Sequence, residues 1–190
     1  GGQEGSSSAA AAAGGSIAQP HAVLFPYPAQ GHINPMMHLA RKLLSDGFFV
    51  TFINTEYNHT RMFAAGHNQS LLLHTRNLRF LHVPDGLPAR HGRFNENLIE
   101  ITAAILALPG PVAKLIKTQA QSPPLVTCII ADSFCSWMQE VADQLGVPRV
   151  ALWTTPTHAS LAYHFQSLLM DHGFSPLRGK PHPIHPIHRS

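Results

Sequence analysis

A short loop around His32 carries the residues best suited to acid–base chemistry. His32 lies in the segment PAQGHINP (residues 28–35), between an apolar run ending at Phe25 and the pair Asn34-Pro35, which is typical of a helix start. A helix dipole that points its positive end at an imidazole favours the neutral form, which can accept a proton. The sequence therefore predicts that His32 is a general base. The alternative is a histidine that only hydrogen-bonds its own loop.

Asp132 is the residue expected to pair with His32. It directly follows the apolar stretch of residues 125–131, and the carboxyl ends of parallel strands meet at one edge of a sheet. A carboxylate bonded to one imidazole nitrogen fixes the tautomer and stabilises the imidazolium that forms when the other nitrogen takes a proton. The alternative is that Asp132 or Ser133 caps a helix beginning near Phe134.

The two residues meet only if a parallel sheet positions them, and the apolar pattern predicts such a sheet. Short apolar runs bounded by turn residues indicate strands, and apolar residues at helical spacing indicate helices. Strands are predicted at residues 22–25, 48–53, 78–83, 125–131 and 150–153. Helices are predicted from Asn34 to a stop at Asp46-Gly47, and at residues 95–108, 112–120, 134–145 and 159–170. This alternation predicts a parallel α/β fold.

Length and composition predict one globular domain between two disordered ends. The chain has 190 residues, 44% of them hydrophobic, which suits a single domain with a buried core. Residues 1–19 form a low-complexity segment of mostly Gly, Ser and Ala, and residues 179–190 form a Pro- and His-rich tail. Both segments are predicted to be disordered, so the expected domain covers residues 20–178.

Charge and cysteine content argue against several classes of protein. The formal charge is +3 without Lys/Arg runs, which disfavours a nucleic-acid partner. Cys128 and Cys135 form no CxxC pair, so neither a zinc site nor a disulfide framework is predicted. The lack of a disulfide framework fits a reducing cytosol, so a cytoplasmic location is expected, and residues 1–19 lack the features of a secretory signal. No stretch approaches the ~20 apolar residues of a membrane-spanning helix.

The fourteen histidines do not predict a metal site. His32 and His38 are six residues apart, as are His158 and His164, and neither pair has the i, i+4 spacing of a helical zinc site. The tail histidines suit weak metal binding as an incidental result of composition. Gly31 is a single glycine where a dinucleotide site requires three. Neither a metal nor a bound cofactor is expected.

The segment HAVLFPYPAQGHINP (residues 21–35) resembles the opening of plant family 1 UDP-dependent glycosyltransferases. Further matches follow in order: Leu39-Ala40, Gly47, VTFINTEYNH (residues 50–59), PDGLP (84–88), ADSF (131–134), LWT (152–154) and GFSPL (173–177). Together they cover residues 20–178.

This resemblance implies a fold and a reaction. The fold is the N-terminal half of GT-B, in which two Rossmann-like domains face each other, the first binding the acceptor and the second the UDP-sugar. In such enzymes the histidine matched by His32 deprotonates an acceptor hydroxyl, and the aspartate matched by Asp132 pairs with it. The implied monomeric enzyme transfers a sugar, with glucose expected, to a small hydrophobic acceptor such as a flavonoid or terpenoid. Transfer proceeds with inversion and without a metal.

The same match implies further substrate-binding residues. Gln30, Gly31 and Phe134 lie within matched motifs, and Thr154 matches a position that approaches the donor sugar. The loop after Asn54 and the helices across residues 95–120 are implied to contribute to the acceptor pocket.

The donor-binding half of the family has no counterpart in this sequence. After Leu177 the family continues into a linker and a UDP-sugar domain, whereas residues 179–190 do not resemble it. A truncated gene model, a frameshift and a real short product all give this pattern, so the chain alone is expected to be inactive. The alternatives to an enzyme are a module that binds a small alcohol or phenol without transforming it, and an inactive truncated product.

Overall fold

A computed structural model describes residues 18–64, 76–88, 91, 93 and 98–173. Residues 1–17, residues 95–97 of a predicted helix and the predicted tail at 179–190 lie outside the described residues. The chain divides into two compact units, with the boundary between Trp153 and Thr154. The first unit contains the sheet, and the second contains two short helices.

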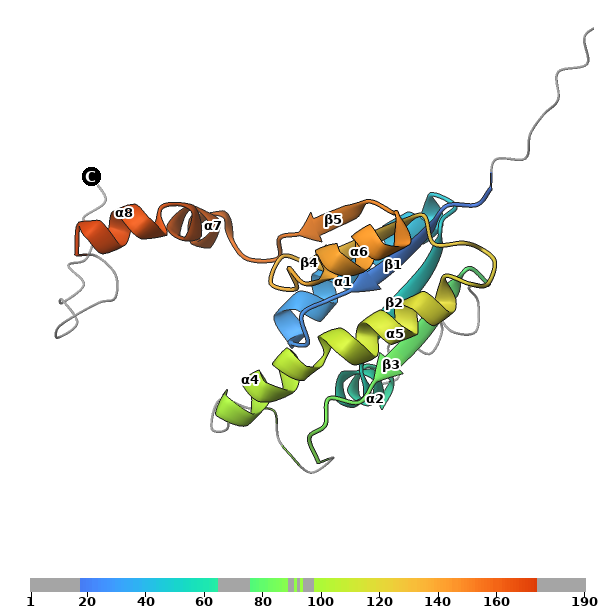
Figure 1. Ribbon diagram of the computed structural model, residues 1–190, viewed down its shortest axis with the longest axis horizontal. Helices are drawn as coiled ribbons and strands as arrows, with labels where there is room; N and C mark the ends of the chain where they lie inside the picture. Colours follow the sequence, from blue (N-terminus) through green and yellow to red (C-terminus); the bar gives the residue numbers. More distant parts are fainter. Residues whose placement is uncertain (1–17, 65–75, 89–90, 92, 94–97, 174–190) are drawn as a thin grey trace, which may run out of the picture. The chain divides into compact units, whose positions relative to one another are not determined.

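In the described part of the chain, five parallel strands form one sheet in the order β3-β2-β1-β4-β5 (Figure 1). The strands are β1 (His21–Phe25), β2 (Phe49–Thr55), β3 (Leu78–Val83), β4 (Cys128–Asp132) and β5 (Arg149–Leu152). Central β1 pairs with β2 through Leu24 and Phe52 and with β4 through Phe25 and Ala131. Every residue of β1 and β2 is buried, as expected of parallel strands covered on both faces. The predicted α/β architecture is confirmed.

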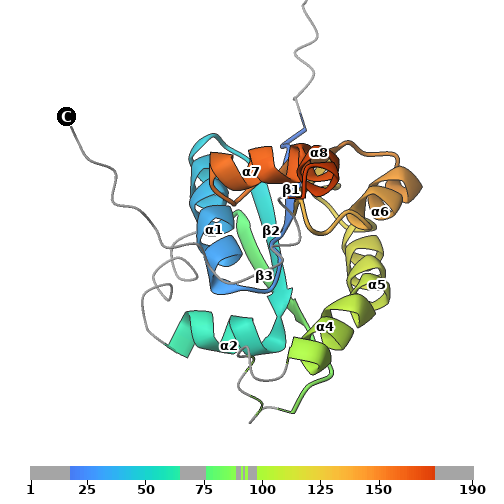
Figure 2. The ribbon, with the colours of Figure 1, turned by 90° about the vertical axis from the view of Figure 1, so that its left-hand side faces the viewer.

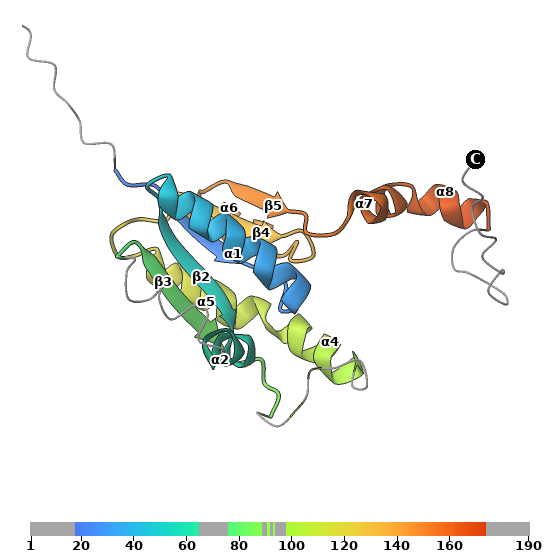
Figure 3. The same ribbon diagram turned by 180° about the vertical axis from the view of Figure 1, so that it is seen from behind.

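Helices cover the two faces of this sheet, as Figures 2 and 3 show. On one face, α1 (Gln30–Ser45) contributes Met36 and Ala40 to a core cluster that includes Leu24 and Phe52. On the other face, α5 (Pro109–Gln119) and α6 (Met138–Leu145) build a second cluster with alternate residues of the same strands. Its fully buried members include Val23, Phe25, Val112, Ile116, Ile129 and Met138. This alternation commits each strand to one register, because a slip of one residue exchanges the two faces.

Helix α1 begins four residues earlier than predicted. Its first residue is Gln30, and the N-cap residue is Ala29, whose side chain offers no capping bond. The Ala29 carbonyl instead accepts the amides of His32 and Ile33, at 2.9 and 3.0 Å. Pro35, predicted at the helix start, lies inside the helix and leaves the Gly31 carbonyl without its usual i+4 donor. His32 is therefore part of the first turn of α1 and not of a preceding loop.

The predicted stop of α1 is confirmed. Gly47 adopts φ +86°, a left-handed conformation that favours glycine, and the Phe48 amide donates to the Leu43 carbonyl at 3.0 Å. Gly146 ends α6 in the same way, with φ +65°.

Three other predicted segments differ from the structure. The stretch after Asn54, predicted as a loop, forms α2 (Glu56–Ala64), whose side chains are at most partly buried. Residues 134–137, predicted as helix, form turns before α6 begins. The predicted helix at residues 159–170 is two helices of the second unit, α7 (Thr157–His164) and α8 (Gln166–Asp171), which meet at Phe165.

The described helical stretch Ile99–Gln119 corrects the expectation about membrane-spanning segments. It comprises most of α4 (Leu98–Ala107) together with α5, and its length and apolar composition are sufficient to cross a membrane. Leu108 and Ile116 are buried in the core, which accounts for part of this composition. Ile99 and Leu106 of α4 are 87% and 73% exposed.

Candidate active site

His32 and Asp132 lie together at the carboxyl edge of the sheet. The Nδ1 atom of His32, in the first turn of α1, is 2.8 Å from Oδ2 of Asp132, the last residue of β4. Asp132 is fully buried, whereas 17% of the His32 side chain is exposed. The pair is adjacent because α1 follows β1, and β1 pairs with β4.

The second carboxylate oxygen of Asp132 has a structural role. Oδ1 accepts the backbone amide of Phe134 at 3.0 Å and so holds the turns that precede α6. The predicted helix cap is wrong in its detail, because α6 begins only at Met138 and its N-cap is Trp137. One oxygen of Asp132 instead holds a turn, and the other contacts His32.

This geometry fixes the chemistry open to His32. An ionised carboxylate only accepts hydrogen bonds, so Nδ1 of His32 donates to Asp132 and Nε2 is the basic nitrogen of the ring. A proton taken up at Nε2 gives an imidazolium that the neighbouring carboxylate stabilises. The pair is thus arranged as a base and its orienting group.

Aromatic rings surround the imidazole. The ring centroids of Tyr27 and Phe134 lie 5.1 and 5.6 Å from that of His32, and the Trp153 ring lies 5.9 Å from Phe134. Burial, with smaller contributions from Cys135 and Asp132, raises the pKa of the Tyr27 phenol, so this hydroxyl stays protonated at neutral pH. The rings limit the access of water to the imidazole.

Cys135 lies close to this pair but is unsuited to nucleophilic chemistry. It is 2% exposed, and its amide donates to the Asp132 carbonyl at 2.9 Å. Burial, and then the negative charge of Asp132, raise the pKa of the Cys135 thiol to about 12. The reactive thiolate is therefore scarce at neutral pH.

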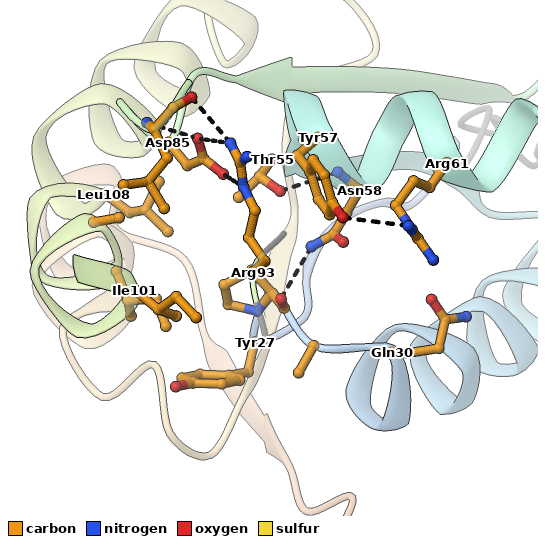
Figure 4. A pocket seen from close by; sticks show the side chains of 15 residues that line it. Tyr27, Gln30, Thr55, Tyr57, Asn58, Arg61, Asp85, Arg93, Ile101 and Leu108 are labelled. Carbon is orange, nitrogen blue, oxygen red and sulfur yellow. Dashed lines mark hydrogen bonds and ion pairs between the residues drawn. The ribbon is translucent and has the colours of Figure 1, made fainter. Parts of the chain in front are cut away.

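A pocket of about 360 Å³ opens at the same edge of the sheet (Figure 4). One side is apolar and is formed by α4 and the residue after it, namely Ile101, Ala104, Ile105 and Leu108. The opposite side is polar and comes from α2 and the start of α1, with Tyr57, Asn58, Arg61 and Gln30. Tyr27 also lines the pocket, so one residue contacts both the pocket and the His32 ring.

An arginine fixes the wall of this pocket. The Arg93 guanidinium binds both carboxylate oxygens of Asp85, at 2.8 and 3.1 Å, and donates to the carbonyls of Pro88, His91 and Leu87. Its Cζ atom lies 4.2 Å from the centroid of the Tyr57 ring. Arg93 adopts φ +48°, an uncommon value for a residue with a side chain, and these contacts hold it there.

Comparison with known proteins shows what kind of chain this is. The protein-family model described as "Glycosyltransferase, N-terminal domain" matches residues 19–180. The chain is 36% identical over 166 residues to a 7-deoxyloganetin glucosyltransferase of Catharanthus roseus, covering 84% of this chain and 34% of that protein. The chain belongs to the plant UDP-glycosyltransferase family. A second glycosyltransferase, (R)-mandelonitrile beta-glucosyltransferase of Prunus dulcis, is 37% identical over 166 residues, covering 86% and 34% of the two chains.

Solved glycosyltransferase structures share the fold. UDP-glucose:anthocyanidin 3-O-glucosyltransferase in complex with UDP aligns with a TM-score of 0.66 and 27% identity, over 80% of this chain and 34% of that one. The Arabidopsis thaliana enzyme UGT89C1 complexed with quercetin aligns with a TM-score of 0.61 and 24% identity, over 80% and 40% of the two chains. The five-stranded sheet is thus the N-terminal half of a GT-B fold. This chain spans about a third of the length of the curated relatives it matches.

Of the other predicted substrate-binding residues of this glycosyltransferase chain, all within the described ranges, only Gln30 lines the pocket. Its side-chain amide is bonded to Asn34 at 2.8 Å. Gly31 is exposed in the first turn of α1, and Phe134 packs on the His32 ring. Among the described residues, neither Phe134 nor the His32–Asp132 pair lines the pocket. Thr154 begins the second unit, so its predicted role remains a prediction.

The segment after Asn54 and the helices across residues 95–120, both named from the resemblance, supply Tyr57, Arg61, Ile101 and Leu108 to the pocket. Sequence reasoning did not identify Tyr27, Asp85 or Arg93, which also line it. Tyr27 and Asp85 lie inside the matched motifs, which is the one signal that could have identified them. The pairing of Arg93 with Asp85 depends on the conformation of the intervening segment and has no periodic sequence pattern. Across the described ranges, no three potential metal ligands lie together.

Proposed function

We propose that this chain is the acceptor-binding part of a glycosyltransferase that transfers glucose from UDP-glucose to a hydroxyl of a small hydrophobic plant metabolite. The observation that carries the proposal is the 2.8 Å contact between His32 Nδ1 and the buried Asp132 carboxylate, next to a pocket of suitable size. A volume of about 360 Å³ lies within the usual range for small-molecule sites. The family of the chain supports the reaction type.

The pocket and the His32–Asp132 pair have separate tasks in this proposal. The acceptor's apolar rings pack against Ile101, Ile105 and Leu108, where burial of apolar area favours binding by roughly 25 cal/mol per Å². Its reacting hydroxyl extends past Tyr27 towards His32, because Tyr27 contacts both the pocket and the imidazole. This arrangement brings the hydroxyl to the base without placing His32 in the pocket wall.

The transfer itself is a single displacement. Nε2 of His32 takes the proton of the acceptor hydroxyl, and Asp132 stabilises the imidazolium that results. The acceptor oxygen forms a bond to the anomeric carbon as the bond from that carbon to UDP breaks. Attack from the side opposite the leaving group inverts the configuration of the sugar. UDP departs with the electron pair of the broken bond.

A chimeric enzyme tests this proposal. Residues 19–180 of this chain are joined to the UDP-sugar-binding half of the Catharanthus roseus relative, and glucose transfer to a panel of phenols is measured. We expect turnover with at least one acceptor and a product of inverted anomeric configuration. His32→Ala should lower the rate by about 10² to 10⁴, the usual contribution of a general base.

His38→Ala is the matched control for this substitution. His38 is exposed on the same helix, six residues from His32, and does not line the pocket. We expect His38→Ala to leave the rate unchanged and both variants to keep the thermal midpoint of the parent. Near-normal turnover of the folded His32→Ala chimera would show that His32 is not the base.

A further inference from the structure

Two arginines line the pocket, and their hydrogen bonding differs. Arg93 donates to both oxygens of Asp85 and to three backbone carbonyls, so its guanidinium is satisfied within the protein. Only 13% of the Arg93 side chain is exposed. Arg93 therefore shapes the wall of the pocket and has little capacity left for a ligand.

Arg61 has capacity that Arg93 lacks. It is exposed on α2, and its Nη1 atom donates a hydrogen bond to the Tyr57 hydroxyl at 3.2 Å. An arginine presents five N–H donors in a planar fork. Within the described ranges, no carboxylate forms an ion pair with Arg61. Figure 4 shows its guanidinium directed towards Gln30, on the side of the pocket away from Ile101 and Leu108.

The charges that line the pocket are unbalanced. Arg61 and Arg93 contribute two positive charges, and Asp85 contributes a single negative charge. A neighbouring pocket of about 380 Å³ shares these three residues, but Glu56 also lines it and balances the charge there. The imbalance is therefore specific to the pocket that Tyr27 lines beside His32.

We propose that Arg61 is a specificity residue that selects acceptors carrying a carboxylate. This inference rests on the proposed function of the pocket as an acceptor site. The apolar ring of the acceptor lies against α4, and its carboxylate lies against α2, where the Arg61 fork donates two parallel hydrogen bonds. The Tyr57 hydroxyl holds the guanidinium in place for this contact. The preferred substrates are thus hydroxylated aromatic or terpenoid acids.

Two ligands that differ in one charge test this inference on the 190-residue chain. 4-Hydroxybenzoate carries a carboxylate at neutral pH, and methyl 4-hydroxybenzoate keeps the phenol ring without the charge. We expect calorimetry to show tighter binding of the acid than of the ester by about tenfold, the effect of one charge-assisted contact. Arg61→Gln should remove this preference by weakening the acid and leaving the ester unchanged. Arg61→Lys should keep part of it.

The controls separate this inference from the proposed function. Arg41→Gln removes the same charge from an exposed site on α1 outside the pocket and should leave the preference intact. Equal affinities for acid and ester, or equal effects of Arg61→Gln on both, would overturn the role of Arg61 while leaving the pocket as an acceptor site. Failure of both ligands to bind would count against the acceptor site itself.

Discussion

Asp132 contacts helix α1, the turn after β4 and strand β5. Its carboxylate contacts His32 and the Phe134 amide, and its backbone pairs with Leu152 of β5. Because the side chain is fully buried, it cannot exchange these partners for water. Its geometry is therefore set by the fold, and the orientation of the His32 ring depends on it.

His21 is a second histidine held by the fold, and its role is structural. It is 0% exposed, its Nδ1 lies 2.7 Å from the Pro124 carbonyl, and its Nε2 lies 2.8 Å from the Thr51 hydroxyl. A carbonyl only accepts, so Nδ1 carries the proton and the Thr51 hydroxyl donates to Nε2. Burial lowers the pKa of His21 below its ordinary value of 6.5, which outweighs the opposing effect of the Pro124 carbonyl.

A pH dependence of stability follows from the lowered pKa of His21. Below pH 6.5 the unfolded chain binds a proton at this residue more readily than the folded chain does. The contribution of His21 to the free energy of unfolding should therefore be fully present above pH 6.5. It should decrease as the pH falls from 6.5 towards the pKa of His21 in the folded chain. Urea unfolding at a series of pH values measures this decrease.

His21→Gln isolates the contribution of this residue. Burial also lowers the pKa of His59, so other groups contribute in the same direction. The variant should be less stable than the parent at neutral pH, and the difference between the two should narrow as the pH falls below 6.5. A constant difference across this range would contradict the assignment.

At the scale of elements, the buried strands could be predicted from the sequence and several helix boundaries could not. Both faces of β1 are covered, so several of its consecutive residues, including Leu24 and Phe25, are apolar. A continuous apolar run of this kind can be recognised from the strand's own residues. The start of α1 depends instead on the Ala29 carbonyl, and the local signal of Asn34-Pro35 pointed to a later start. Helix α2 has only partly buried side chains, among them Met62 and Phe63, and this short apolar pair is a weak signal for a helix.

In the site, too, some contacts could be predicted from the sequence and others could not. The meeting of His32 and Asp132 could be predicted because His32 follows β1 and Asp132 ends β4, and the carboxyl ends of parallel strands lie at one edge of a sheet. The contacts of Arg93 could not be predicted, because they require a residue with φ +48° in an irregular segment. Periodicity carries no information about such a segment.

Helix α4 and its junction with α5 allow a matched test of packing. Leu108 is 2% exposed in the core, and Leu106 is 73% exposed two residues earlier. Leu108→Ala should lower the free energy of unfolding by about 2–5 kcal/mol, because it removes buried methyl groups and leaves a cavity. Leu106→Ala should change it by about 0.5 kcal/mol or less. Chemical denaturation measures both values, and equal losses would contradict the described packing.

At the scale of the whole molecule, the sheet and its core belong to the first unit. All five strands of the sheet, both core clusters and the lining of the pocket belong to residues before Thr154. The helices of the second unit, α7 and α8, contribute no residue to either cluster. The packing described for the sheet therefore comes from residues of the first unit.

Truncation after Trp153 tests whether the sheet depends on the second unit. We expect the shortened chain to keep the thermal midpoint of the parent within about 3 °C, since a loss of 1 kcal/mol shifts a domain of this size by a similar amount. Its affinity for a phenol ligand should stay within roughly twofold, as for independent sites. A cooperative unfolding transition at a much lower temperature would show that the second unit supports the sheet.

Because His32 contacts Asp132, the NMR signal of its imidazole proton also depends on the register between β1 and β4. His32 follows β1 and Asp132 ends β4; these neighbouring strands pair Phe25 with Ala131, and one residue of strand spans about 3.3 Å. A slip of one residue would move Asp132 beyond hydrogen-bonding reach of Nδ1 and turn its side chain to the other face. The low-field imidazole proton resonance that disappears in His32→Ala, and so is distinct from that of buried His21, thus reports whether β1 and β4 are correctly aligned without a substrate.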